Sequence, residues 1–219
     1  MSILRPVVYD GFAQRQLGQG DVLGGGEVIP ATVVTTAITV TGDQLANGII
    51  LRNPAAGATD TLDSAANILA AVSAGMGTFG LPNGLSWRVR WIVTTAQTTT
   101  VQATANTGVT VTRGSISASS AKEFLFTVVN GTPAQTFQAT TVSGSAVLSG
   151  LTSAQCALLS VGMIVTNAVA NLQGQTIIAI NSTSGTVTMS GNANATNTTP
   201  VTVAFSPVVK LEGLQQGGI

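Results

Sequence analysis

Side chains that could carry out acid–base chemistry are few in this sequence, and they are scattered. Its 219 residues include no histidine, so the commonest general base and metal ligand is missing. The eight carboxylate residues are Asp10, Asp21, Glu27, Asp43, Asp60, Asp63, Glu123 and Glu212. Only Asp60 and Asp63 are close in sequence, and a role in capping a helix N-terminus explains both. The spacing therefore predicts no catalytic carboxylate pair and no metal site.

Nucleophilic side chains give no stronger signal. The single cysteine, Cys156, can form no intrachain disulfide, and without a histidine it has no partner base. We interpret it as a small buried hydrophobic side chain. Serine and threonine are abundant, but no G-x-S-x-G motif is present. We therefore expect neither an enzyme nor a bound cofactor.

Three features could bind a ligand, and none defines a site. The glycine-rich LGQGDVLGGG (17–26) resembles a phosphate-binding loop, but it lacks the G-K-[S/T] ending and a strand–loop–helix context. Trp87 and Trp91 alternate onto one face of a predicted strand, as aromatic platforms of a glycan site would, but core packing is the better explanation. The Asn- and Thr-rich loop 191–200 suits a solvated turn as well as it suits a glycan contact.

Charge is scarce and unevenly placed along the chain. Charged residues make up 7% of it, against roughly 25% in an ordinary soluble domain, and the formal net charge is zero. No basic patch is available to neutralise phosphates, so we expect no nucleic-acid partner. Charge nevertheless gathers in the first 27 positions, at Arg5, Asp10, Arg15, Asp21 and Glu27. Because this segment has no sustained hydrophobic period, we interpret residues 1–27 as an extended arm, with one short strand near PVVY.

The rest of the chain is predicted to be all-β, since Val and Thr dominate and both fit a pleated sheet. We expect a β-sandwich or jelly-roll-like domain over 28–140, with a turn near Gly42–Asp43 and a last strand at 135–140. Alternating residues at 81–93 give its clearest strand. One short helix is predicted within 59–75, with Thr61 as its N-cap and Gly75 closing its C-terminus.

A small β-barrel-like module is expected over 141–210. Its five short strands are predicted at 144–151, 161–167, 175–181, 185–191 and 200–205. The most apolar stretch, 154–172, contains Gln155, Gly162, Asn167 and Asn171, so we interpret it as a turn and a strand of a soluble module rather than a membrane span. The polar, glycine-rich end, 211–219, is predicted to be a tail.

Three short motifs resemble a β-rich domain of bacteriophage virion proteins, especially capsid decoration and head-fibre proteins. They are a strand ending in R-N-P (52–54), D-T-L (60–62) before an alanine-rich helix, and the turn N-T-G-V-T (106–110). The stretch from GSAVLSGL to PVTVAF (144–205) is similar to a small β module of phage structural and appendage proteins, except at AQCALLSVG (154–162). The segment RQLGQGDVL (15–23) also looks like the connector that precedes domains of phage appendages.

The resemblance implies a capsid decoration (cement) protein on the outer surface of the virion. Such a protein would bind the major capsid protein, self-associate as a homotrimer and assemble in the host cytoplasm, with neither nucleic acid nor a membrane as a partner. In this hypothesis the arm anchors the protein to the shell by strand addition, and its charges fix the register. The arm residues expected at that contact are Arg5, Tyr9, Asp10, Phe12, Arg15, Leu17 and Asp21. The alternative is a receptor- or glycan-binding fibre or tail appendage protein.

Overall fold

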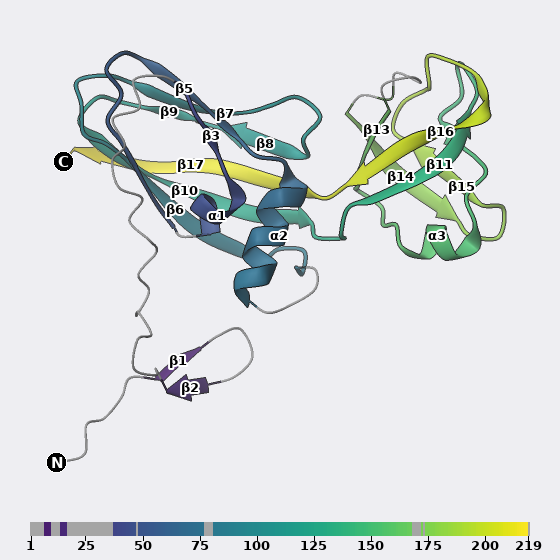
Figure 1. The fold of residues 1–219 in the computed structure, drawn as a ribbon, viewed down its shortest axis with the longest axis horizontal. Helices are drawn as coiled ribbons and strands as arrows, with labels where there is room; N and C mark the ends of the chain where they lie inside the picture. Colours follow the sequence, from purple (N-terminus) through teal and green to yellow (C-terminus); the bar gives the residue numbers. More distant parts are fainter. Residues whose placement is uncertain are drawn as a thin grey trace.

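The computed structural model describes residues 37–46, 48–76, 81–167, 172 and 174–218, together with the backbone of 7–9 and 14–16. In the predicted arm, β1 (Val7–Tyr9) and β2 (Gln14–Gln16) form an antiparallel pair. The described residues are mostly β with three helices, which confirms the all-β prediction. Two separate hydrophobic clusters mark a sandwich, with two helices beside it, and a barrel-like module (Figure 1).

The sandwich consists of two sheets that share one hydrophobic core. The five-stranded sheet contains, in spatial order, β4 (Ile49–Arg52), β6 (Ser86–Val93), β10 (Ser120–Asn130), β17 (Val208–Gly218) and β8 (Val109–Thr112). The four-stranded sheet contains β3 (Thr39–Val40), β5 (Ala58–Leu62), β7 (Thr99–Ala103) and β9 (Ser115–Ile116). In the five-stranded sheet, β10 is antiparallel to both of its neighbours, whereas the outer strands β4 and β8 run parallel to theirs.

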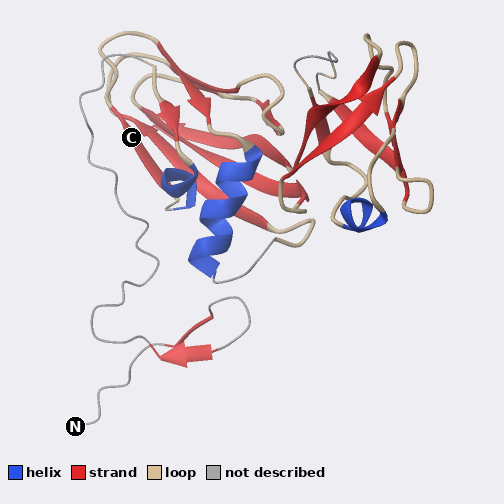
Figure 2. Cartoon of the chain, turned by 45° about the vertical axis from the view of Figure 1, so that its right-hand side comes forward, coloured by secondary structure: helices blue, strands red, loops and turns tan. Residues whose placement is uncertain are grey.

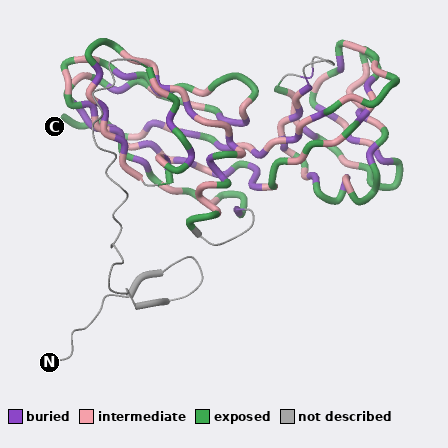
Figure 3. The backbone as a smooth tube through the Cα atoms, viewed as in Figure 1, coloured by how far each residue is buried: buried purple, intermediate pink, exposed green. Residues whose placement is uncertain are grey.

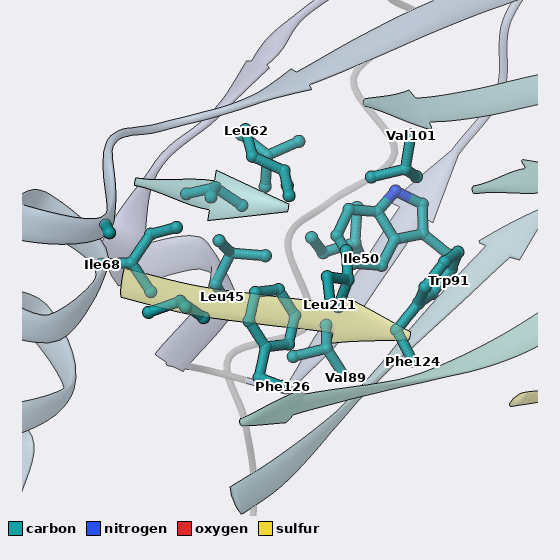
Figure 4. Close-up of a cluster of buried hydrophobic side chains, with 14 of the residues drawn as sticks. Leu45, Ile50, Leu62, Ile68, Val89, Trp91, Val101, Phe124, Phe126 and Leu211 are labelled. Atoms are coloured by element: carbon teal, nitrogen blue, oxygen red, sulfur yellow. The ribbon is translucent and has the colours of Figure 1, made fainter. Parts of the chain in front are cut away.

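The core forms because one face of each long strand is apolar. In β6 the side chains alternate, so that Arg88 and Arg90 are exposed and the other set faces the core, as the sequence predicts. That set is Trp87, Val89, Trp91 and Val93. Figure 4 shows Trp91 beside Phe124, and the two rings meet edge-on with centroids 5.2 Å apart. Buried positions follow the inner faces of both sheets (Figure 3).

Two helices cover one side of the sandwich (Figure 2). The short α1 (Gly42–Ala46) occupies the predicted turn, and Leu45 inserts into the core. The longer α2 (Ala65–Met76) begins four residues after Thr61, so the predicted N-cap is wrong. Thr61 lies in β5, because that stretch pairs with β3 and β7. The Ser64 hydroxyl accepts the Asn67 N–H at 3.2 Å instead, and Gly75 lies inside the last turn of the helix rather than after it.

The second module is a six-stranded, nearly closed sheet around its own core. Its spatial order is β11 (Gln135–Thr141), β16 (Asn197–Ser206), β13 (Ile164–Thr166), β14 (Gln175–Asn181), β15 (Thr186–Met189) and β12 (Val147–Leu148). Thr140 and Ser149 exchange backbone hydrogen bonds of 2.9 and 3.1 Å, which joins the two ends of the sheet. No charged residue lies between Glu123 and Lys210, so this module is uncharged.

Three segments differ from their predicted places. The strand expected at 135–140 in the sandwich is β11, which pairs with β16 of the second module. The expected tail over 211–219 is the greater part of β17, which lies between β10 and β8 in the sandwich because both neighbours supply backbone hydrogen bonds. The chain forms α3 (Ser153–Ala157) where the turn of 154–172 was predicted, and this helix begins with a capping box between Thr152 and Gln155.

Candidate functional site

The predicted arm residues contribute no described side chain. Tyr9 lies in β1 opposite Gln14, and Arg15 lies in β2 opposite Val8. The others, Arg5, Asp10, Phe12, Leu17 and Asp21, lie outside the described residues, as does the glycine-rich stretch 17–26. The shell-binding role of the arm therefore stays a prediction.

Asp60 forms a buried ion pair with Arg52 and is not a helix cap. The Arg52 guanidinium donates from Nε to Oδ2 and from Nη2 to Oδ1 of Asp60, each at 2.8 Å. The two side chains are 2% and 0% exposed, so the predicted capping role of Asp60 is wrong. The pair links the end of β4 to the middle of β5 and therefore joins the two sheets. Both carboxylate oxygens are held by Arg52, which fits a structural role.

Asp63 lies two residues before the first residue of α2 and supports the start of the helix through Ser64 and Asn67, rather than by capping a backbone N–H of the helix. Its Oδ1 accepts the backbone N–H of Ser64 and the side-chain N–H of Asn67, both at 2.7 Å. The carboxylate stands just before α2, where it meets the positive end of the helix dipole. Asp43 lies in the first turn of α1 and is exposed.

Lys122 is a buried cation that the sequence does not reveal, because it lies in a hydrophobic strand. Its Nζ donates to the carbonyl oxygens of Arg113 and Ser115 at 2.6 and 2.7 Å. Burial, and then the nearby charge of Arg113, lower the pKa of the ammonium. Ser119 and Lys122 have the S-x-x-K spacing of some acyl-transfer enzymes. The Ser119 hydroxyl donates to Thr95 O at 3.3 Å, however, so each side chain is bonded to backbone instead.

The remaining reactive side chain, Cys156, is buried at 2% exposure, which confirms the predicted hydrophobic role. Burial raises the pKa of its thiol. Among the described residues, no three Cys, Asp or Glu side chains gather as a metal site requires. No helix in this part of the chain is both long and apolar enough to cross a bilayer.

Both tryptophans are engaged in the sandwich rather than in a surface site. Trp91 is fully buried, and Trp87 is half-buried and stacks on Phe126 with ring centroids 5.0 Å apart. This confirms the prediction of core packing. The predicted loop 191–200 is shorter in the structure, because residues 197–200 belong to β16. Its remaining part is tied to the β11 end of the barrel, since Thr196 Oγ1 accepts the Ser143 N–H at 2.9 Å.

Exposed charge gathers on one surface, the side of the five-stranded sheet that faces away from the core. We call it the outer face, and it comprises Arg88, Arg90, Glu123, Leu125, Lys210 and Glu212. Arg88 donates to Glu123 at 3.0 Å, and Lys210 donates to Glu212 at 3.3 Å. The sequence predicts the outward direction of Arg88 and Arg90, but it misses Lys210 and Glu212 because they fall in or beside the presumed tail.

A shallow hollow of about 290 Å³ lies at one end of the outer face. Its lining residues are Arg90, Ala121, Glu123 and Gln215–Gly218. A sheet surface is hollowed where its side chains are small. Here the small residues are Ala121, Gly217 and Gly218. The Arg90 guanidinium at its rim makes no ion pair with any described residue, so it can receive a carboxylate.

A second hollow, of about 360 Å³, lies where the two modules join. It is bounded by α2 residues, by the connector 131–134 and by Pro207. Beside it, the buried Asn130 side chain donates to Ser160 Oγ and Val161 O, both at 2.9 Å. Its Oδ1 accepts the Thr132 N–H at 3.0 Å. This cluster bonds the end of the sandwich to the barrel-like module.

Among the described residues, exposed charge therefore lies mainly on the outer face. Of the other described charged side chains, Arg52, Asp60, Asp63 and Lys122 are hydrogen-bonded, whereas Asp43 and Arg113 are exposed. No protein-family model, curated protein or solved structure matches the chain.

Proposed function

We propose that the protein is a bacteriophage capsid decoration (cement) protein, which binds the outer surface of the head. The observation that carries the proposal is that two motifs of the virion-domain resemblance contact each other, and the third contacts the alanine-rich helix that follows them. Arg52 of R-N-P pairs with Asp60 of D-T-L. Thr107 O, in the turn N-T-G-V-T, accepts the N–H of Ala65, the first residue of α2, at 2.8 Å. Motifs that pack together in one part of the fold support the resemblance to the virion domain better than three motifs far apart would.

The chemistry of the described residues supports a structural, non-enzymatic role. Buried charges hold the fold, since Arg52 joins two sheets and Lys122 fixes the turn at Arg113–Ser115. A decoration protein needs contact surfaces rather than titrating groups, and the outer face and the uncharged barrel-like module provide them.

In this proposal, copies self-associate as a homotrimer on the shell, and the uncharged module suits close packing. Neighbouring copies of that module experience no repulsion between like charges, and contacts between them depend little on salt. Each contact can be weak, because many copies act together on one head. The arm, residues 1–27, binds the major capsid protein.

Deletion of residues 1–27 tests the arm. The full chain and the truncated chain would be incubated with expanded heads that lack the protein, and bound copies would be counted after sedimentation. We expect the truncated chain to lose most of its binding while keeping its circular dichroism spectrum. The matched control is the full chain with Arg113→Gln, an exposed change outside the arm, which should bind normally. Undiminished binding of the truncated chain would refute the anchoring role.

The alternative, a glycan- or receptor-binding appendage, has less support. Each tryptophan and phenylalanine that the structure describes is buried or half-buried, so those rings offer no exposed stacking platform for a sugar. Copy number separates the two functions directly. We expect intact particles to contain the protein in amounts similar to the major capsid protein, whereas an appendage would be present at only a small fraction of that amount.

A further inference from the structure

The outer face holds the charges that the fold itself does not use. Elsewhere in the described part of the chain, Arg52 and Asp60 neutralise each other, Lys122 donates to two carbonyls, and Asp63 accepts from Ser64 and Asn67 at the start of α2. Beyond these residues, only Asp43 and Arg113 lie away from the outer face. In a chain with 7% charged residues, such a concentration on one sheet face indicates a surface that binds something charged.

The pairing on this face leaves a positive charge available. Both of its carboxylates, Glu123 and Glu212, already accept from Arg88 and Lys210. Arg90 is the third cation and is exposed at the rim of the 290 Å³ hollow. A guanidinium beside a hollow is a suitable receptor for a carboxylate, which it can bind through two parallel hydrogen bonds. The ligand that fits is therefore an extended acidic segment with one side chain that enters the hollow.

The chain itself contains such a segment. Between β2 and the first residues of the sandwich, residues 17–36 carry only two charges, Asp21 and Glu27, and both are acidic. The segment also contains Gly18, Gly20 and Gly24–Gly26, and a chain poor in side chains can lie flat on a sheet. Fully extended, its twenty residues reach roughly 66 Å, at ~3.3 Å per residue. That length is enough to reach a neighbouring molecule.

The topology favours a neighbour over the same molecule. Residue 37 leads into β3, which is the edge strand of the four-stranded sheet. That sheet lies across the core from the outer face (Figure 1). To reach its own outer face the segment would have to wrap around the sandwich, whereas the outer face of a second copy imposes no such path.

We propose that residues 17–36 of one copy bind the outer face of a second copy, with a carboxylate of Asp21 or Glu27 on Arg90. This inference rests on the self-association in the proposed function, and it specifies which surfaces meet. It narrows the shell contact of the proposed function to residues 1–16, because Leu17 and Asp21, which were expected at that contact, would lie on a neighbouring copy instead.

Charge reversal in the full chain tests the contact. Sedimentation equilibrium would measure the dissociation constant of the oligomer for wild type, Arg90→Glu, Asp21→Arg/Glu27→Arg, and the combination. We expect each reversal alone to raise the dissociation constant about tenfold, because attraction becomes repulsion. The combination should recover most of that loss. Arg113→Glu, an equal charge change off the face, should have no effect, and circular dichroism would verify that each variant is folded.

Three results would overturn the proposal. They are a wild-type chain that is monomeric at every concentration, a dissociation constant unaffected by Arg90→Glu, and a combined variant no better than the single reversals. If residues 17–36 bind the outer face of their own molecule instead, the wild-type chain stays monomeric, which is the first of these results. Binding of Arg90→Glu to heads tests the decoration function separately, since the proposed shell contact does not involve Arg90.

Discussion

Arg52 and Asp60 form a two-point ion pair between the two sheets of the sandwich, with both hydrogen bonds at 2.8 Å. Arg52 is the last residue of β4, and Asp60 is the third residue of β5. Taking both charges out of water is costly, and their attraction returns about as much as it costs. The pair therefore contributes more to the alignment of the two sheets than to their total stability, because other alignments would break both hydrogen bonds between these buried charges.

Removing the charge of one partner should lower the free energy of unfolding far more than replacing both partners with apolar residues. We expect Asp60→Asn to lower the free energy of unfolding by about 3–5 kcal/mol, because it removes the negative charge that Arg52 binds through two hydrogen bonds in a buried site. The double variant Arg52→Met/Asp60→Leu should cost less than the sum of its two single variants. Urea unfolding of wild type, Arg52→Met, Asp60→Leu and the double variant gives this coupling energy directly. Additive costs would show that the two side chains do not act as a pair.

The strand pattern of the sandwich could be predicted where a single face is apolar. In β6 the alternation of Val89 and Trp91 with Arg88 and Arg90 gives both the strand and its orientation. Asp60 could not be placed in this way, because its partner lies eight residues away on another sheet. A carboxylate before an alanine-rich stretch suits a helix cap as well as an ion pair, and tertiary pairing decides between them.

The last strand, β17, also could not be predicted from its local sequence. Residues 208–218 are polar and rich in glycine, yet they form β17 between two other strands. Only Val209 and Leu211 carry a clear inward pattern, and the hydrogen bonds come from strands far away in sequence. Because residues 211–219 were predicted to be a tail, Lys210 and Glu212 were not predicted to lie on the outer face. By contrast, the helix α3 has a local signal, since Thr152 and Gln155 have capping-box spacing.

Replacing Gly131 and Gly75 by alanine should change the free energy of unfolding in opposite directions. A Cβ at Gly131 would lie 1.7 Å from the carbonyl oxygen of Leu81, so Gly131→Ala must displace backbone where the modules join. We expect a loss of about 1–3 kcal/mol in the free energy of unfolding. A Cβ at Gly75, in the last turn of α2, would meet nothing within 4 Å. Gly75→Ala should therefore stabilise the protein by about 0.5–1 kcal/mol, and thermal unfolding would measure both.

Lys122 should make stability rise with pH in the alkaline range. Burial and Arg113 lower its pKa in the folded state below the ordinary value of 10.5. Between those two values the unfolded chain binds more protons than the folded chain, so the free energy of unfolding increases as pH rises toward 10.5. Lys122→Met lacks this pH dependence, because it has no group that titrates at this position. At neutral pH it should be about 1–3 kcal/mol less stable than wild type, because two carbonyls lose their donor.

Urea unfolding of wild type and Lys122→Met from pH 7 to pH 10 measures this effect. The difference between the two proteins should widen as pH increases. Cys156 also titrates in this range, but it is present in both proteins, so its contribution cancels. A difference that stays constant with pH would contradict a lowered pKa for Lys122.

Asn130 should fix the orientation of the barrel-like module. Its side chain is 2% exposed and bonds to Ser160, Val161 and Thr132 across the connection between the modules. Asn130→Ala leaves a buried carbonyl and an N–H without their partner, so we expect a loss of about 2–3 kcal/mol in the free energy of unfolding. We also expect the two modules to sample a wider range of mutual orientations, since the connector 131–134 and Pro207 then hold them with fewer contacts.

Residual dipolar couplings measured for each module would report that range. The matched control is Asn181→Ala, because Asn181 Oδ1 accepts the N–H groups of Thr183 and Ser184 in a turn within the barrel-like module. That change removes a similar number of hydrogen bonds without touching the joint. It should lower stability but leave both modules with a common alignment tensor. If Asn130→Ala also retains one common tensor, packing at the joint and not Asn130 sets the orientation.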